Sequence, residues 1–143
     1  MGRKRLRYKI FEHTADVGLY AYGSGLEELF ANAAAGLMSL VVGTSEIAAV
    51  EETPISLEAG SAEELLRAWL AELLYFYNAE GKLFAGAEFT TLTDTRLEAV
   101  VQGETLDPAR HEVACEVKAV TWHGLRVERG KKGRLRAALV LDV

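Results

Sequence analysis

Three ionisable side chains and a hydroxyl group lie close together near the start of the chain, within residues 11–18. Glu12 and Asp16 offer hard oxygen ligands, which suit calcium or magnesium. His13 would instead suit a softer metal, or would act as a proton-transfer group. Thr14 and Asp16 could equally make only local hydrogen bonds in a turn. The segment by itself therefore leaves both a functional loop and a plain turn open.

The last residues supply two more negative groups. An apolar run over residues 139–141 is typical of a buried strand, and it is followed by Asp142 and by the terminal carboxylate of Val143. Neighbouring negative groups repel each other unless a cation or a basic group balances them. If this strand ends beside Asp16, three carboxylates converge and a divalent cation becomes plausible. Otherwise the terminus is a frayed end exposed to solvent.

Other familiar sites are missing from the sequence. It has no phosphate-binding glycine-rich loop and no serine in a nucleophile elbow, and its three histidines lack the spacing of a zinc protease. Because Cys115 is the single cysteine, a disulfide within the chain and an all-cysteine zinc site are both excluded. We interpret Cys115 as an inert, small hydrophobic residue. Lys118 stands in an otherwise apolar run, where a lysine either reaches solvent at a sheet edge or pairs with a carboxylate.

Charge is distributed unevenly along the chain. Sixteen basic against 21 acidic residues give a formal net charge of −5, which disfavours a protein whose main task is to grip nucleic acid. Basic residues nevertheless gather in residues 3–9 and 126–136, while the middle is acidic. These clusters are read either as a solvated tail and hairpin or as a docking surface for RNA or an acidic partner.

Length and composition predict one globular domain over residues 1–143, with a basic leader over residues 1–7 whose order the sequence leaves open. The chain has 143 residues, of which 50% are hydrophobic, enough to form a core. No run approaches the roughly 18 apolar residues of a membrane helix, and no apolar signal region follows the leader. With one cysteine, a cytoplasmic protein is the simplest interpretation.

Apolar residues at helical spacing predict two amphipathic helices, over about residues 25–42 and 62–78. Each begins with a capping-box pattern, Ser24 to Glu27 in the first and Ser61 to Glu64 in the second. Trp69 falls in the second apolar stripe and is expected in the core. Trp122 is expected to pack on a strand rather than to stack at the surface.

The remaining sequence has the alternation and turn signals of strands. We expect them over residues 8–11, 17–22, 54–58, 87–92, 97–102, 113–121, 125–128 and 135–141. Strands in runs around two separate helices indicate an α+β fold rather than an alternating parallel α/β fold. The predicted architecture is a mixed or antiparallel sheet with both helices packed on one face.

Six segments spread along nearly the whole chain are informative when taken together and in order: FEHTADVG (11–18), LEELF (26–30), WLAELLY (69–75), LDPARH (106–111), EVKAVTWHGL (116–125) and LDV (141–143). Through these segments the sequence resembles the archease family. The basic leader and the hairpin at residues 126–136 lie outside these segments. Trp122 stands where the family often has tyrosine, which keeps an aromatic ring.

The resemblance implies the archease fold and an accessory role without enzymatic activity. Archeases assist the RtcB-type RNA ligase in tRNA splicing, promoting its guanylylation with GTP and its multiple turnover. The ligase would be the protein partner, and tRNA would be reached indirectly through it. The family also carries a divalent-cation site, expected to hold calcium, with magnesium or manganese as alternatives. The matching positions here are Asp16, Asp142 and Val143, and Glu12, His13, Arg110 and Lys118 are candidates to support the site or the ligase-activating role.

Two further functions compete with ligase activation. One is a chaperone or modulator of a tRNA methyltransferase. The other is a metal-dependent phosphoesterase that uses Asp16 with Glu12 or His13, although the acidic balance and the missing nucleophile motif count against it.

Overall fold

The computed structural model describes residues 6–13 and 16–143. Its elements follow the order β1 (Tyr8–His13), β2 (Asp16–Gly23), α1 (Leu26–Val42), β3 (Glu51–Glu58), α2 (Ala62–Glu80), β4 (Lys82–Leu92), β5 (Arg96–Thr105), β6 (Ala119–Val120), β7 (Arg126–Arg129), the 3-10 turn η1 (Lys131–Gly133) and β8 (Leu135–Asp142). Thr14 and most of the basic leader lie outside the described residues. Leader residues 6 and 7 lie within them.

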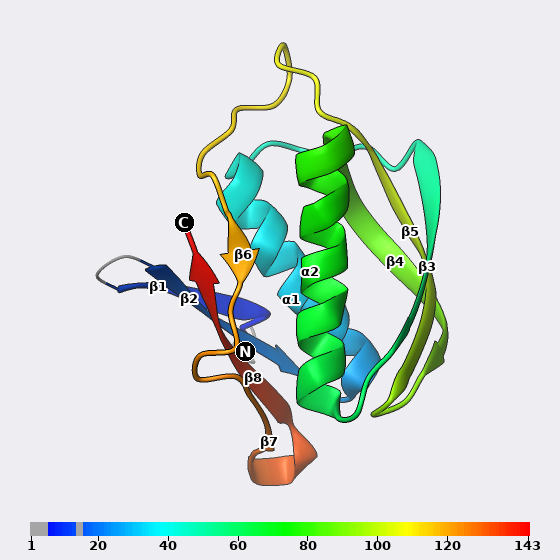
Figure 1. Cartoon of the computed structure of the whole chain (residues 1–143), viewed down its shortest axis with the longest axis vertical. Coiled ribbons are helices and arrows are strands. Elements are labelled where there is room, and N and C mark those ends of the chain that lie inside the picture. The colour runs from blue at the N-terminus through cyan, green and yellow to red at the C-terminus, as the bar shows by residue number, and fades with distance from the viewer. Residues whose placement is uncertain (1–5, 14–15) are drawn as a thin grey trace, which may run out of the picture.

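The described strands form two antiparallel sheets with the helices between them (Figure 1). One sheet has the order β1-β2-β8-β6, with β7 also paired to β8, and the other has the order β3-β5-β4. The expected α+β fold in a single domain is confirmed. The helices do not share one face of one sheet, because each contacts both sheets. Buried residues lie on more than one side of α1: Leu29 and Met38 are nine positions apart, which places them on opposite sides, and this shows why the helix needs two covering surfaces.

Both helices begin close to where capping residues place them. On α2, Ser61 accepts a hydrogen bond from the Glu64 backbone N–H, as the capping box predicts. On α1 the cap residue is Gly25 and makes no side-chain hydrogen bond. Ser24 instead pairs with the Glu28 carboxylate, so the expected partner Glu27 was wrong by one position.

The core fills the space between the sheets. Trp69 is fully buried, as predicted, and its indole N–H donates to the Phe30 backbone oxygen of α1 at 3.0 Å. This bond ties the two helices together and satisfies the polar end of the ring. On the five-stranded sheet, alternate residues of β8, from Leu135 to Leu141, are buried against the helices.

The segment before β6 differs from its expected strand. Only Ala119 and Val120 of residues 113–121 pair in a sheet, and residues 106–118 form a long connection. Lys118 is exposed and lies just outside the strand. Trp122 was expected to pack on a strand, but it is 59% exposed, with the Arg67 guanidinium 4.1 Å from its ring centre. That arrangement is a cation–π contact at the surface of α2.

Candidate functional site

The two aspartates singled out in the sequence are direct partners across the five-stranded sheet. β2 and β8 pair antiparallel with Asp16 opposite Asp142, followed by Val17 opposite Leu141. Directly opposed residues present their side chains on the same face of a sheet. Because Leu141 faces the core and side chains alternate along a strand, the Asp16–Asp142 pair lies on the outer face. The last strand therefore ends beside Asp16, which is what a shared cation site requires.

The end of β8 is held on both sides. Asp142 pairs with Ala119 of β6 as well as with Asp16, and the Lys118 backbone N–H donates to the Asp142 carbonyl oxygen at 2.7 Å. Val143 is partly buried and packs against the core. The alternative of a frayed terminus is therefore wrong, and Asp142 stands in a fixed position at the sheet end.

Phe11 and Gly18 explain part of the 11–18 motif as packing. These residues face each other across β1 and β2, and a Cβ atom on Gly18 would lie only 1.9 Å from the Phe11 ring. The ring occupies the space that the glycine leaves open, and it also contacts the Tyr20 ring, with centroids 4.9 Å apart. The Phe11 and Tyr20 rings thus lie on the same outer face of the sheet as Asp16.

Glu12 and His13 are the last residues of β1. Their backbones pair with Val17 and Asp16, so the register runs from His13 through Asp16 to Asp142 across three strands. This alignment brings the polar residues of the 11–18 segment to the same end of the sheet as the C-terminal carboxylates. Their role as supporting residues stays a prediction.

The donors at this sheet end suit a hard divalent cation. Asp16 and Asp142 supply carboxylate oxygens, and Val143 follows next along the chain. Oxygen ligands of this kind are those that calcium and magnesium take. Among the described residues, no group of three or more His, Cys, Asp or Glu side chains is arranged around one point. A cation here would therefore need a further donor, from Val143 or from elsewhere, as its third ligand.

A second polar cluster lies elsewhere, around Glu104 at the end of β5. Its side chain is 5% exposed, and both carboxylate oxygens are paired with the Arg110 guanidinium, one at 3.3 Å. The Ala48 backbone N–H and the His111 ring bind the same carboxylate. The hydrogen bonds from Arg110, followed by the one from Ala48, lower the pKa of Glu104 from its usual 4.5 to about 2.

His111 is the buried centre of this cluster. Its Nδ1 atom accepts a hydrogen bond from the Asp107 backbone N–H at 2.9 Å, which assigns the proton of the neutral ring to Nε2. Nε2 lies 3.1 Å from the Glu46 carbonyl oxygen and 3.2 Å from the Glu104 carboxylate. The ring thus joins the 106–118 connection to the segment after α1.

The structure therefore separates the sequence-predicted site residues into two places. Asp16, Asp142, Val143 and the backbone of Lys118 meet at the sheet end. The Arg110 side chain is engaged with Glu104 and with Asp107, at 3.3 Å from the latter. Sequence reasoning did not single out Glu104. The signal was available, since a glutamate closing a buried strand needs a basic partner.

Within the described part of the chain, no helix is long and apolar enough to cross a membrane.

Comparison with known proteins gives a consistent result along the whole chain. The model of the "Archease protein family (MTH1598/TM1083)" matches residues 8–143. Proteins called "Protein archease" from Pyrococcus abyssi and Thermococcus gammatolerans are 37% and 38% identical to it, each over 96% of this chain and 99% of their own.

Two solved structures share the fold. The solution structure of protein 1598 from Methanobacterium thermoautotrophicum superposes with a TM-score of 0.80 at 34% identity, covering 96% of this chain and 99% of the other. The crystal structure of a Thermotoga maritima protein, described as an archease and possible chaperone, superposes with a TM-score of 0.61. It is 20% identical over 99% of this chain and 100% of its own, so this likeness concerns the fold alone.

Proposed function

Because the chain belongs to the archease family, we propose that it is a non-enzymatic accessory protein of an RNA ligase of the RtcB type. In this role it promotes guanylylation of the ligase with GTP and sustains its turnover in joining tRNA exons in the cytoplasm. The observation that carries the proposal is the family match over residues 8–143, which includes the sheet end formed by Asp16 and Asp142.

The geometry of the sheet end suits an accessory role. Asp142 is exposed and its backbone is fixed by β2, β6 and the Lys118 N–H, so a partner protein can approach a preorganised carboxylate. Positioning charged groups in advance lowers the entropic cost of assembling a reaction site. The exposed Asp142 carboxylate on the outer face can therefore enter the cleft of another protein, with the half-buried Asp16 beside it.

Asp16, Asp142 and the terminal carboxylate of Val143 would hold the cation, for which calcium is the first candidate and magnesium or manganese the alternatives. When bound, the cation supplies positive charge that balances the carboxylates and can attract a phosphate. The chain's own contribution is to keep the donors on adjacent strands in fixed register.

The test is single-turnover guanylylation of the cognate ligase with labelled GTP, with and without this protein. We expect a clear acceleration that Asp16→Ala abolishes and that Asp94→Ala, in the exposed β4–β5 turn, preserves. Asp16→Ala should retain its fold, which circular dichroism would verify. No acceleration of a competent ligase by the wild-type protein would contradict the proposal. That result would favour the alternative, a chaperone or modulator of a tRNA methyltransferase.

A further inference from the structure

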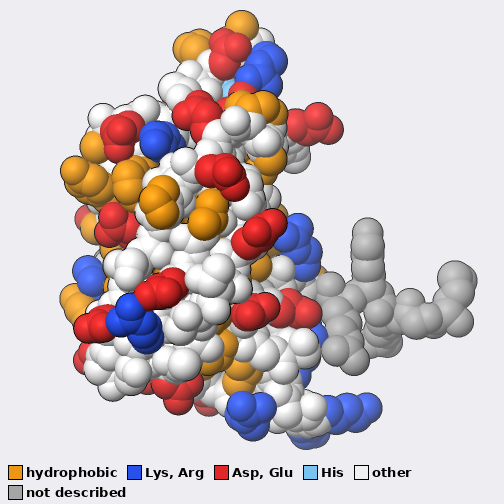
Figure 2. Space-filling model, turned by 90° about the vertical axis from the view of Figure 1, so that its right-hand side faces the viewer, with side chains coloured by type: hydrophobic (Ala, Val, Ile, Leu, Met, Phe, Trp, Pro, Cys, Tyr) orange, Lys and Arg blue, Asp and Glu red, His pale blue; other side chains and the backbone are white. Residues whose placement is uncertain are grey.

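Positive charge is concentrated at one end of this acidic molecule. Residues 126–136, which form β7, η1 and the start of β8, contain six basic residues and one acidic residue, whereas the whole chain carries −5. Figure 2 shows Lys and Arg side chains gathered at the lower end of the molecule, where Figure 1 places this hairpin. Acidic side chains are spread over the rest of that face. We call residues 126–136 the basic hairpin.

Much of this charge is not neutralised within the fold. Lys131 and Lys132 are exposed and form no ion pair with any described residue. Arg129 donates to the Gly133 carbonyl oxygen at 3.0 Å and likewise has no acidic partner in the described chain. Glu128 is the one acidic residue of the hairpin, and it lies between two arginines, 3.8 Å from Arg126 and 3.4 Å from Arg136.

The basic hairpin also borders a hollow of about 470 Å³. It is lined by Lys131, Lys132 and Arg134 of the hairpin and by Leu6 and Tyr22 from the start of the chain. Its volume falls in the range of roughly 300–1,000 Å³ that is usual for small-ligand pockets. It combines cationic groups with an aromatic ring, the combination that proteins use to hold the phosphates and stack the bases of single strands.

Arg134 lines this hollow and is held in place by a hydrogen bond. One guanidinium nitrogen, Nη2, donates to the Leu6 carbonyl oxygen at 3.0 Å, which fixes the side chain against the irregular segment before β1. The other, Nη1, is buried and makes no hydrogen bond within the described part of the protein. The guanidinium as a whole keeps its positive charge, which would attract a phosphate placed in the hollow that Arg134 lines.

The basic surface continues on the outer face of the five-stranded sheet. Arg136 lies 5.7 Å from the centre of the Tyr20 ring, and Lys9 pairs with Tyr20 across β1 and β2. Arg136 and Asp142 are six positions apart along β8, a distance of about 20 Å in an extended strand. The same sheet face is thus basic at one end and acidic at the other.

From these observations we infer that the basic hairpin and the adjoining hollow bind the phosphate backbone of a single-stranded RNA directly. This goes beyond the proposed function, in which RNA is reached only through the ligase, and does not depend on it. The net negative charge does not oppose such binding, because charges separated by more than the Debye length of about 8 Å are largely screened at physiological salt. A phosphate chain is favoured over an acidic peptide, because the hollow offers the Tyr22 ring beside its cationic side chains, and a ring of this kind can stack with a base.

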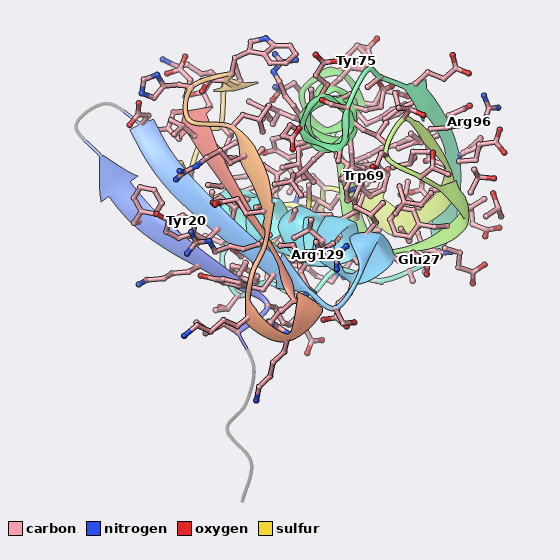
Figure 3. All side chains as sticks on the ribbon, turned by 90° about the horizontal axis from the view of Figure 1, so that it is seen from below. Tyr20, Glu27, Trp69, Tyr75, Arg96 and Arg129 are labelled. Atoms are coloured by element: carbon pink, nitrogen blue, oxygen red, sulfur yellow. The ribbon has the colours of Figure 1, made fainter. Side chains whose placement is uncertain are left out.

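The test measures binding of a fluorescent 12-nucleotide uridine oligomer by anisotropy, using this protein alone at several salt concentrations. Lys131→Gln/Lys132→Gln removes two exposed charges from the hairpin. Lys82→Gln/Arg96→Gln removes two charges from the three-stranded sheet and is the matched control. Figure 3 shows Arg96 on the far side of the molecule from Tyr20. Thermal unfolding of both double variants should stay close to wild type, since all four side chains lie at least partly in solvent.

We expect the hairpin variant to bind several-fold more weakly than wild type, and the control variant to bind like wild type. Each phosphate contact on a single strand contributes about 0.7 to the slope of log K against log salt, so losing two should reduce that slope by about 1.4. Polyglutamate of equal charge should compete poorly. The inference is overturned if the wild-type protein does not bind the oligomer at low salt, if both variants weaken equally, or if polyglutamate competes as well as RNA.

A separate measurement distinguishes this inference from the proposed function. Guanylylation of the ligase in the absence of RNA should be accelerated equally by wild type and by Lys131→Gln/Lys132→Gln. If the hairpin variant loses this acceleration, the hairpin contacts the ligase instead, and the RNA assignment is wrong even though ligase activation stands.

Discussion

Asp16 on β2 lies directly opposite Asp142 on β8, on the outer face of the five-stranded sheet. The two residues are separated by almost the whole chain, and antiparallel pairing places their carboxylates on neighbouring strands. Cross-strand residues of like charge destabilise a sheet slightly. Two carboxylates held in fixed register at one sheet end are donors of the kind that the proposed cation site requires.

We therefore predict that Asp142→Asn reduces the stabilisation that calcium gives. A ligand at 100 times its dissociation constant stabilises the folded state by about 2.7 kcal/mol, and weaker binding lowers this value. Calorimetric melting with and without calcium would measure the difference, with Asp94→Asn as the control. Without cation, Asp142→Asn should be as stable as wild type or more stable by at most about 1 kcal/mol. An unchanged calcium-induced shift in Asp142→Asn would show that this residue is not a ligand.

Protonation of Glu104 should cause a large share of the stability that this protein loses at acid pH. Hydrogen bonds from Arg110 lower its pKa in the folded protein to about 2, below the usual 4.5. Because the folded-state pKa is the lower one, this stabilisation is complete above about pH 4.5 and is lost as the pH falls toward 2. Glu104→Gln should therefore lower stability at neutral pH and flatten the pH dependence between those values.

Urea unfolding midpoints from pH 2 to pH 7 would measure this effect. Glu88→Gln, at an exposed position on β4, is the control and should keep the wild-type profile. A Glu104→Gln profile as steep as that of wild type would mean that other carboxylates govern the acid transition.

The two glycines at the β4–β5 irregularity should respond differently to alanine. A Cβ atom on Gly103 would lie 1.8 Å from the Leu83 carbonyl oxygen, a backbone atom that cannot easily move. On Gly86 the nearest atom is Gln102 Oε1, at an ordinary 3.7 Å. Gly103→Ala should cost about 1–3 kcal/mol or more, and Gly86→Ala about 0.5 kcal/mol at most. Denaturant unfolding of both variants would show whether the strands approach as closely as described.

The two tryptophans should also differ in their contribution to stability. Trp69 is fully buried and bonded to Phe30, so Trp69→Ala should cost about 3–5 kcal/mol. Trp122 is mostly exposed over Arg67, and an exposed cation–π contact is worth about 0.5–1 kcal/mol. Urea unfolding of Trp122→Ala is the decisive measurement. A loss as large as that of Trp69→Ala would mean that Trp122 is buried in solution.

The two helices could be predicted from the sequence because the patterns that indicate them are local. Apolar spacing and the Ser61–Glu64 capping pattern lie within single turns and do not depend on the rest of the fold. The proximity of Asp16 to Asp142 could be stated only as a condition, since strand pairing across the whole chain leaves no local signal. The division into two sheets was missed for the same reason, because alternating strands look alike in one sheet or two.

The 106–118 connection shows the opposite error. Its apolar residues, such as Val113 and Val117, resemble a strand in isolation. In the structure it is held by distant contacts instead. The Ala114 N–H donates to the Val41 carbonyl oxygen, and His111 contacts the Glu46 carbonyl oxygen. Tertiary contacts of this kind override local strand preference, and only the fold reveals them.

The pairing of β2 with β8 also fixes an order of events during translation. Strands β3 to β5 and α2 are contiguous in the chain, so a nascent polypeptide can assemble the three-stranded sheet early. The β1–β2 hairpin emerges first, but its inner partner β8 is translated last. At roughly 5–20 residues per second, the free edge of β2 waits several seconds on the ribosome before β8 covers it. The growing chain thus passes through a stage with an open sheet edge, which is vulnerable to misassembly and closes only when residues 135–142 have left the ribosome.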